Sequence, residues 1–171
     1  MGFGLGGDER HPPEPFAAAF AIAADAGLLR VPHAGELAGP DSVRAALDAL
    51  GADRVQHGVR ALEDAELVAR LAASGVCLDV CITSNVALGV VPTVAAHPLP
   101  KLLAAGVPCS LNADAPLLFA TGLLSEYVAA REQLALTDET LAGVARASLG
   151  GCGAPEALRR RALAAIDAWL D

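Results

Sequence analysis

The sequence is poor in basic residues, and this scarcity excludes a large class of partners. Among 171 residues it has 12 Lys and Arg against 20 Asp and Glu, which gives a formal net charge of -8 at pH 7. Proteins that bind nucleic acid neutralise the phosphate backbone with clustered Lys and Arg. The one basic cluster, residues 159–161, is more typical of a solvated helix face. We therefore expect no nucleic-acid partner.

Signals for membranes and for structural cysteines are also absent. No apolar stretch approaches the roughly 20 residues that cross a bilayer, and the chain does not open on a charged leader with an apolar core and a cleavage site. The four cysteines, at positions 77, 81, 109 and 152, do not have a zinc-binding spacing. A disulfide between Cys77 and Cys81, on one face of one strand, would have poor geometry. We expect no membrane partner, reduced core thiols and a cytoplasmic location.

Apolar residues are abundant, at 54% of the chain, and they fall into short strand-like and longer helical runs that alternate. The strand-like runs cover residues 28–33, 54–57, 76–82 and 107–112, with a partial one at 3–5. Helices are predicted over residues 16–26, 41–50, 63–74, 98–105, 117–135, 138–149 and 155–170. This alternation predicts an α/β fold with right-handed βαβ units and a parallel sheet, in a single domain over residues 1–171.

The number of strands predicts only part of a barrel. A complete (β/α) barrel closes with eight strands in about 250 residues, and this chain offers four complete strands. We therefore predict a partial (β/α) TIM barrel, roughly the second half, with strands 5 to 8 and the C-terminal helices. A smaller α/β fold that stands alone is the structural alternative.

Polar residues with catalytic potential follow three of these strands. They are His33 and Glu36 in the segment His33-Ala34-Gly35-Glu36, His57, and Asp114. Enzymes with parallel sheets carry their chemistry at such strand ends. His33 and Asp114 suit a mixed nitrogen and oxygen zinc site, and zinc lowers the pKa of bound water to about 7. His57 could orient or deprotonate that water, and a turn at Gly35 could bring Glu36 inward to deliver a proton.

Each of these residues also has a plainer interpretation. A histidine such as His33 at a strand end is often a hydrogen-bonded structural residue, and Glu36 alone could be a solvated loop acid. Asp114 could be a turn or helix N-cap residue. His97, before Pro98, is most simply a helix starter. The combination, in the order of successive barrel strands, favours catalysis.

Six segments together resemble the adenosine deaminase family of zinc-dependent enzymes with the amidohydrolase fold. They are GFGLGGDE from residue 2, HAGE from 33, RVQHGVRALED from 54, CITSN from 81, HPLPKLLAAGVPCSLNADAP from 97, and the pair Glu126-Tyr127. The resemblance covers nearly the whole chain, in the family's order, and corresponds to the family's carboxy-terminal part.

The resemblance implies a role for each candidate residue. His33 and Asp114 would bind Zn²⁺, Glu36 would donate a proton to purine N1, and His57 would position and deprotonate the water. Gly7 would contact the purine ring. The implied reaction is hydrolytic deamination of adenosine or a related purine to an inosine-type product and ammonia, as in purine salvage. The implied partner is a small-molecule purine nucleoside.

Several positions depart from the family pattern. The family's opening strand supplies two zinc ligands in a His-x-His pair, whereas the four histidines here lie at positions 11, 33, 57 and 97. Ala115 stands where the family usually has an acid that hydrogen-bonds purine N7. Gly4 and Ile82 stand where many members have Asp and Pro.

These departures leave two hypotheses. In the first, the chain is the carboxy-terminal part of a deaminase whose remaining zinc ligands come from another chain, and its substrate could also be adenine. In the second, it is a non-catalytic remnant, or a half-barrel module that acts only with a partner. Because a half barrel exposes a sheet edge and apolar helix faces, we expect a homo-oligomer or a missing N-terminal half.

Overall fold

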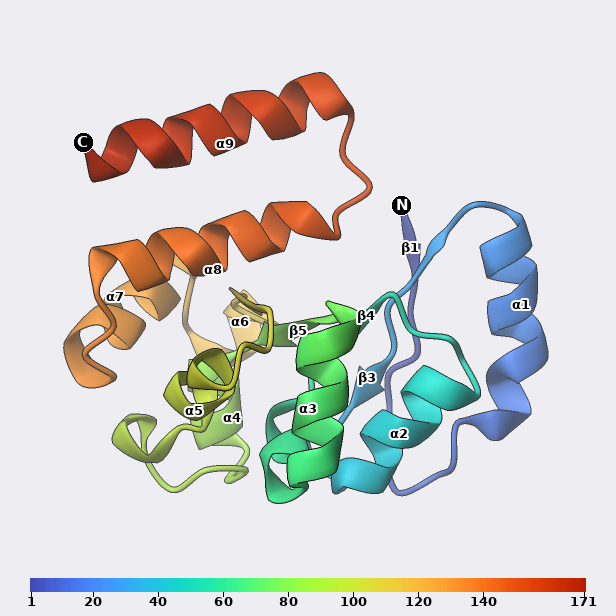
Figure 1. Cartoon of the computed structure of the whole chain (residues 1–171). Helices are drawn as coiled ribbons and strands as arrows, with labels where there is room; N and C mark the ends of the chain where they lie inside the picture. The colour runs from blue at the N-terminus through green and yellow to red at the C-terminus, as the bar shows by residue number, and fades with distance from the viewer.

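The strands run parallel and lie beside one another in the order of the sequence. The computed structural model describes residues 1–171 and contains two parallel sheets (Figure 1). In the first, β1 (Gly2–Phe3) pairs with β2 (Leu29–Arg30). The second has the order β3 (His33–Ala34), β4 (Arg54–His57), β5 (Cys77–Val80) and β6 (Cys109–Leu111). The predicted parallel α/β architecture is confirmed.

The two sheets are joined at a proline. The strand predicted over residues 28–33 is divided into β2 and β3 at Pro32, which has no N–H for a ladder. The pairing with the β1 segment nevertheless continues, because the N–H of Val31 donates to the carbonyl of Phe3 and that of His33 to the carbonyl of Leu5, at 2.9 and 2.8 Å. The segments around β1 and β2–β3 therefore continue the order of the four-stranded sheet.

Most predicted helices are present, with bounds shifted by one or two residues. They are α1 (Ala17–Asp25), α2 (Pro40–Asp48), α3 (Ala65–Ser74), α5 (Leu99–Ala104), α8 (Asp138–Gly150) and α9 (Glu156–Leu170), and the 3-10 helices are η1 (Glu14–Phe16), η2 (Val59–Glu63) and η3 (Val94–Ala96). The carboxylate of Asp64 caps α3 by accepting from the N–H groups of Glu66 and Leu67. No helix is long and apolar enough to span a membrane.

Two helical regions differ from the prediction. The segment 117–135 forms two helices, α6 (Pro116–Phe119) and α7 (Leu123–Gln133), because Ala120 adopts a left-handed backbone with φ 50°. The second difference is α4 (Ile82–Ala87), which the sequence did not predict. It begins with two β-branched residues, Ile82 and Thr83, whose local preference is for strand, and Ile82 is completely buried.

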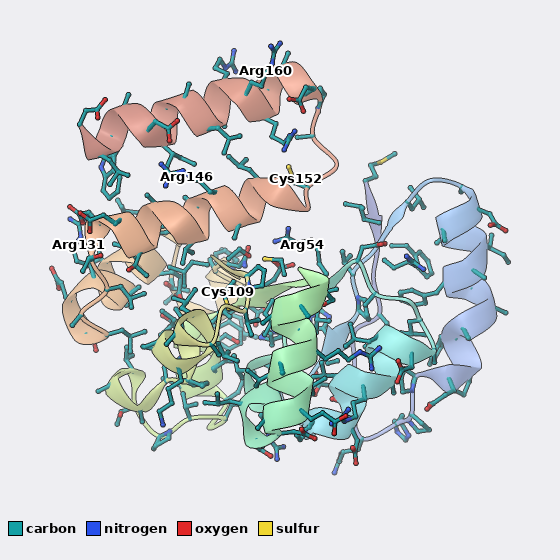
Figure 2. All side chains as sticks on the ribbon, in the orientation of Figure 1. Arg54, Cys109, Arg131, Arg146, Cys152 and Arg160 are labelled. Carbon is teal, nitrogen blue, oxygen red and sulfur yellow. The ribbon has the colours of Figure 1, made fainter.

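The core lies between the four-stranded sheet and the helices that cover it. It contains 21 buried residues, and α2, α3, α5 and α8 contribute Val43, Leu67, Leu102 and Leu141, among others. By contrast, α9 has no buried residue and lies along α8 (Figure 1). Arg160 projects from the outer side of α9, as expected of a solvated helix face (Figure 2).

A buried ion pair ties the sheet together below the strand ends. The guanidinium of Arg54 on β4 donates to the carboxylate of Asp79 on β5 at 2.5 Å, and the hydroxyl of Ser110 on β6 donates to the same carboxylate at 2.7 Å. Arg54 also reaches the carbonyl of Ser148 in α8, at 3.5 Å (Figure 2). The network fixes three neighbouring strands relative to one another.

A tight turn at Gly35 brings the segment after β3 back against the sheet. Gly35 has φ +69°, and a Cβ added there would lie 2.4 Å from Cγ2 of Val43 and 3.2 Å from Cα of Gly58. Both the left-handed backbone and the lack of space favour glycine. The turn places Glu36 in the interior, where it is only 7% exposed. The expectation that Gly35 brings Glu36 inward agrees with this geometry.

We expect Gly35→Ala to destabilise the chain by about 2–4 kcal/mol, because overpacking against Val43 adds to left-handed backbone strain. Gly75→Ala is the matched control: Gly75 has φ +72°, but nothing lies within 4 Å of its added Cβ. It should lose only the strain component, roughly 1–2 kcal/mol. Chemical denaturation measures both changes, and equal losses would show that the space around Gly35 is not restrictive.

Candidate active site

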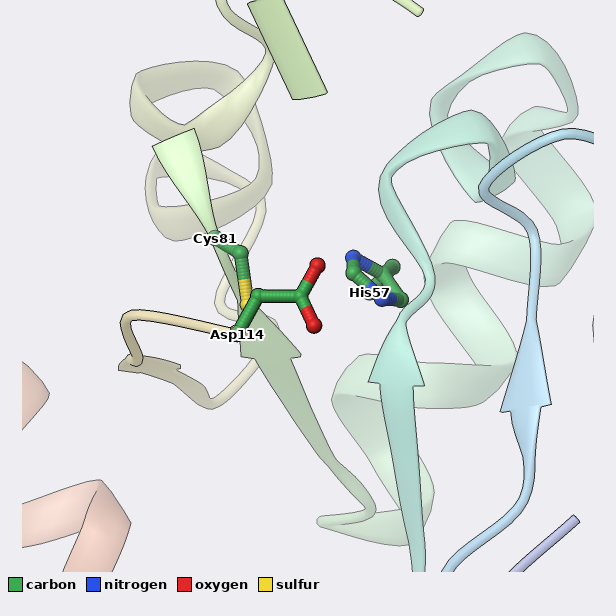
Figure 3. A group of neighbouring side chains, drawn as sticks. All are labelled: His57, Cys81 and Asp114. Carbon is green, nitrogen blue, oxygen red and sulfur yellow. The ribbon is translucent and has the colours of Figure 1, made fainter. Parts of the chain in front are cut away.

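Three potential metal-binding side chains meet at the carboxyl ends of neighbouring strands. His57 ends β4, Cys81 directly follows β5, and Asp114 lies three residues beyond β6. Their ligand atoms all lie within 4.8 Å of one another. Figure 3 shows the carboxylate of Asp114 pointing toward the ring of His57, with the Cys81 sulfur beside Asp114. The three residues line a cavity of about 310 Å³ together with Gln56, Asp79, Asn112 and Ala113.

Both His57 and Asp114 have a strained backbone. Their φ angles are 64° and 53°, and only two other non-glycine residues in the chain have a positive φ. This conformation is costly for residues with a Cβ and is concentrated at functional sites. In both cases it turns the chain sharply at a strand end. The fold thus holds these two side chains at the cavity although their backbone conformations are unfavourable in free energy.

Asp114 and His33 each have a hydrogen-bond partner that orients them. The hydroxyl of Ser84 donates to Oδ2 of Asp114 at 2.6 Å. The carbonyl of Leu5 lies 2.9 Å from Nδ1 of His33, so Nδ1 carries the hydrogen and Nε2 keeps its lone pair. Metal-ligating residues typically have such supporting partners. Asp114 does not cap α6, whose N-cap is Ala115 and lacks a side-chain hydrogen bond.

The structure places His33 beside this group of three residues but not in it. The ring centroids of His33 and His57 are 5.2 Å apart. His33 lines a different cavity, of about 190 Å³, and Gly7 lines the same one. The third member of the group is instead Cys81, which the sequence assigned only to the core. No strand-end signal marked Cys81 in the sequence, because the strand was predicted over residues 76–82, whereas β5 ends at Val80.

Glu36 and His57 have pKa values that are shifted in opposite directions. Burial raises the pKa of Glu36 to about 7, with further contributions from Glu9 and Asp114. Burial, assisted by His33, lowers the pKa of His57 to about 4. Oε1 of Glu36 lies 3.2 Å from Nδ1 of His57. Near neutral pH a large share of Glu36 therefore retains its proton while His57 is neutral, so the pair can supply both an acid and a base.

The backbone of the Glu36 segment is held by a second carboxylate. Oε2 of Glu9 accepts from three consecutive N–H groups, those of Glu36, Leu37 and Ala38, at 3.0, 2.9 and 2.8 Å. Successive N–H groups that converge in this way form an anion-binding nest. The segment that carries Gly7 is thereby linked to the segment that carries Glu36. Sequence reasoning missed Glu9, because the contact spans 27 residues.

The donor set is chemically compatible with zinc. Histidine nitrogen, carboxylate oxygen and cysteine sulfur are its usual protein ligands. The two predicted ligands, His33 and Asp114, both have oriented donor atoms, and His57 and Cys81 lie beside them. Burial raises the pKa of the Cys81 thiol far above its usual range, which disfavours the thiolate that zinc would bind. His33 and Asp114 alone leave a tetrahedral site short of two ligands.

Comparison with known sequences identifies the class of protein. The family model described as adenosine deaminase matches residues 1–169. The chain belongs to the adenosine deaminase family. A Streptomyces coelicolor protein assigned as an adenosine/adenine deaminase is 52% identical over 171 residues, which are 99% of this chain and 50% of that protein. An adenine deaminase from Sinorhizobium medicae is 46% identical over 166 residues, which are 96% of this chain and 51% of that protein.

Solved structures agree with the sequence comparison. The crystal structure of an adenine deaminase from Arthrobacter aurescens superposes with a TM-score of 0.95 at 35% identity, over 99% of this chain and 52% of that one. A zinc-bound amidohydrolase from Burkholderia ambifaria superposes with a TM-score of 0.89 at 27% identity, over 98% and 48% of the two chains. The prediction of a partial TIM barrel is confirmed. The chain spans about half the length of the relatives it matches, and it corresponds to their carboxy-terminal part.

We expect Glu9→Gln to loosen the Glu36 segment, because an uncharged amide oxygen is a weaker acceptor for the three N–H donors than a carboxylate oxygen. Hydrogen–deuterium exchange should become faster at the amides of residues 36–38, corresponding to about 1–3 kcal/mol of lost local stability. The control is Glu156→Gln on the exposed surface of α9. Unchanged exchange at residues 36–38 in Glu9→Gln would contradict the role of Glu9.

Proposed function

We propose that the chain is the carboxy-terminal portion of a zinc-dependent purine deaminase, and that it supplies the acid, the base and part of the metal site for hydrolytic deamination of adenosine or adenine. The observation that carries this proposal is the placement of Glu36, His57 and Asp114 around one strand-end site, with the pKa values of Glu36 and His57 shifted apart. The names of the relatives, which include adenine and adenosine, support a 6-aminopurine substrate.

Zinc would be held by His33 and Asp114 together with ligands from outside this chain, and when bound it would supply an activated water near neutral pH. Neutral His57 orients the attacking water and takes one of its protons. Glu36 donates its proton to N1 of the purine as the water oxygen bonds to C6. This proton makes the ring a better electron acceptor at the step where negative charge would otherwise develop on N1.

The remaining proton transfers complete the reaction. The C6–N6 bond breaks, and the amine leaves as ammonia with the proton that His57 took from water. The new hydroxyl group on C6 loses its proton to Glu36 and becomes the carbonyl of the product. Both residues return to their starting states. We place Gly7 against the purine ring, since its open φ +129° backbone lies in the cavity beside His33.

A second candidate function is a non-catalytic remnant, or a module that acts only with a partner. The specific observations in its favour are Ala115 beside Asp114 and the absence of a His-x-His pair in the sequence. We favour the catalytic proposal because the chain has all four candidate residues, which are His33, Glu36, His57 and Asp114, and the structure brings them to one region. We also propose that the activity belongs to purine salvage in the reducing cytoplasm, in keeping with four free cysteines.

The test uses this chain joined to the amino-terminal half of the Streptomyces coelicolor relative. Zinc is measured by elemental mass spectrometry, and deamination by the loss of adenosine or adenine absorbance. Glu36→Gln should keep the zinc and lower turnover by on the order of 10²- to 10⁴-fold, because the amide cannot donate the catalytic proton. Glu63→Gln, an exposed change beside Arg60, is the control.

The outcomes separate the hypotheses. Turnover retained in Glu36→Gln would make the proton-donor assignment wrong. A zinc-free and inactive joined protein would support the remnant.

The pH profile of kcat provides a further prediction. Deamination needs protonated Glu36, whose pKa is about 7, and neutral His57, whose pKa is about 4. Activity should therefore decrease when the pH is raised above about 7, where Glu36 loses its proton. It should also decrease when the pH is lowered below about 4, where His57 becomes protonated. Steady-state kinetics across this range would measure both limbs. A rate that keeps rising well above pH 7 would contradict Glu36 as the acid.

A further inference from the structure

Glu126, the first member of the Glu126-Tyr127 pair, is a completely buried carboxylate that the proposed reaction does not use. It lies in the first turn of α7, and its exposed fraction is 0%. Acidic side chains are rarely buried without a cationic partner, yet Glu126 takes part in none of the ion pairs of the chain. Burying such a group costs free energy unless hydrogen bonds compensate for it. Its hydrogen bonds should therefore show what it does.

The first contact of Glu126 is with the start of α4. Its Oε2 accepts from the N–H of Thr83 at 3.2 Å. This N–H lies before the first intrahelical bond, which the N–H of Asn85 donates to the carbonyl of Cys81 at 3.0 Å. First-turn N–H groups need a partner from outside the helix, and the N-cap residue Cys81 makes no side-chain hydrogen bond. Glu126 thus supplies, from another helix, the partner that a local cap would normally supply.

The second contact of Glu126 is with the segment that follows Asp114. The hydroxyl of Thr121 donates to Oε1 of Glu126 at 2.8 Å. Thr121 comes directly after Ala120, whose left-handed backbone ends α6. Asp114 and Thr121 are therefore the two ends of the short segment that contains α6. One buried carboxylate thus joins α4, α7 and the segment 114–121.

The α4 helix carries two side chains that reach the candidate site. The hydroxyl of Ser84 donates to Oδ2 of Asp114 at 2.6 Å, and the amide of Asn85 donates to Oε1 of Glu36 at 3.0 Å. Ser84 and Asn85 lie within two residues of the N–H that the carboxylate binds, and they are at most 1% exposed. Because hydrogen bonds weaken steeply as their geometry departs from the optimum, a shift of α4 would disturb both contacts. The placement of Asp114 and Glu36 therefore depends on the position of α4.

We propose that Glu126 is a positioning residue, which fixes α4 and the segment 114–121 relative to each other and thereby places Asp114 and Glu36 for the reaction. Glu126 bonds to neither of these two residues and acts through the elements that it joins. That it fixes the two elements follows from its hydrogen bonds, whereas the catalytic consequence rests on the proposed function. The two parts are therefore tested by separate measurements.

The first measurement is NMR of the metal-free 171-residue chain. In the wild type the amide of Thr83 should be protected from hydrogen exchange, although first-turn amides have no intrahelical partner. Glu126→Leu should make this exchange at least about tenfold faster, because the acceptor is lost. It should also lower the ¹⁵N order parameters of residues 114–121. Glu126→Gln should preserve most of both, since its amide can accept from Thr83 and donate to the hydroxyl of Thr121.

The control is Glu132→Leu, the same substitution at an exposed position of α7, which should change neither quantity. Two results would overturn the proposal. They are a wild-type Thr83 amide that exchanges at the unprotected rate, and a folded Glu126→Leu variant with wild-type exchange and order parameters. If Glu126→Leu does not fold, Thr121→Val replaces it, because it removes one hydroxyl at nearly constant volume. Unchanged order parameters of residues 114–121 in Thr121→Val would overturn the proposal equally.

The second measurement uses the joined protein, with Co²⁺ as the probe of the metal site. Glu126→Leu should weaken Co²⁺ binding and lower kcat, each at least about tenfold, as is typical when the supporting partners of a metal site are lost. Glu126→Gln should restore most of both losses, and Glu132→Leu should cause neither. Wild-type Co²⁺ affinity and kcat in a folded Glu126→Leu variant would make Glu126 a packing residue and overturn the proposal. If the wild-type joined protein is inactive, the proposed function fails, while the NMR result still decides whether Glu126 fixes the two elements.

Discussion

The site depends on the register of the hydrogen bonds between neighbouring parallel strands in the four-stranded sheet, from β3 through β4 and β5 to β6. His33 is paired with Gln56 and Ala34 with His57, while Asp79 is paired with Ser110. Because side chains alternate between the two faces of a strand, a slip of one residue would turn the site residues to the opposite face. The Arg54–Asp79 ion pair crosses the same strands at a lower level and opposes such a slip. The positions of all the site residues at the strand ends therefore depend on correct strand pairing.

Left-handed backbone turns at the strand ends orient the site residues, which strand pairing alone does not do. Gly35, His57 and Asp114 all have left-handed backbone conformations at strand ends. Each turns its segment immediately after a strand, and the hydrogen bonds from Ser84 and to Glu9 then hold Asp114 and the Glu36 segment. Two of the four non-glycine residues with a positive φ, His57 and Asp114, are thus at candidate catalytic positions, where such strain is often found.

The sequence predicted the parallel architecture and the four polar candidates at strand ends because both signals are local. Short apolar runs, glycine stops, and polar residues after strands can all be read from neighbouring positions. The sequence did not reveal Cys81, Glu9 or Asn85 as parts of the site, although the amide of Asn85 donates to Oε1 of Glu36 at 3.0 Å. Their contacts depend on strand order, loop path and amide orientation, which are tertiary properties. The α4 helix was missed because Ile82 and Thr83, with which it begins, have a local preference for strand.

The first and last strands each have a side without a strand partner, and Asp114 is exposed. The relatives are about twice as long as this chain, and in the proposed function residues from outside this chain complete the site. The direct test is the Co²⁺ absorption spectrum of the chain alone and of the joined protein. We expect about one bound Co²⁺ only in the joined protein, lost in Asp114→Ala and without a thiolate charge-transfer band. Stoichiometric Co²⁺ on the chain alone, with such a band from Cys81, would contradict a site shared between two halves.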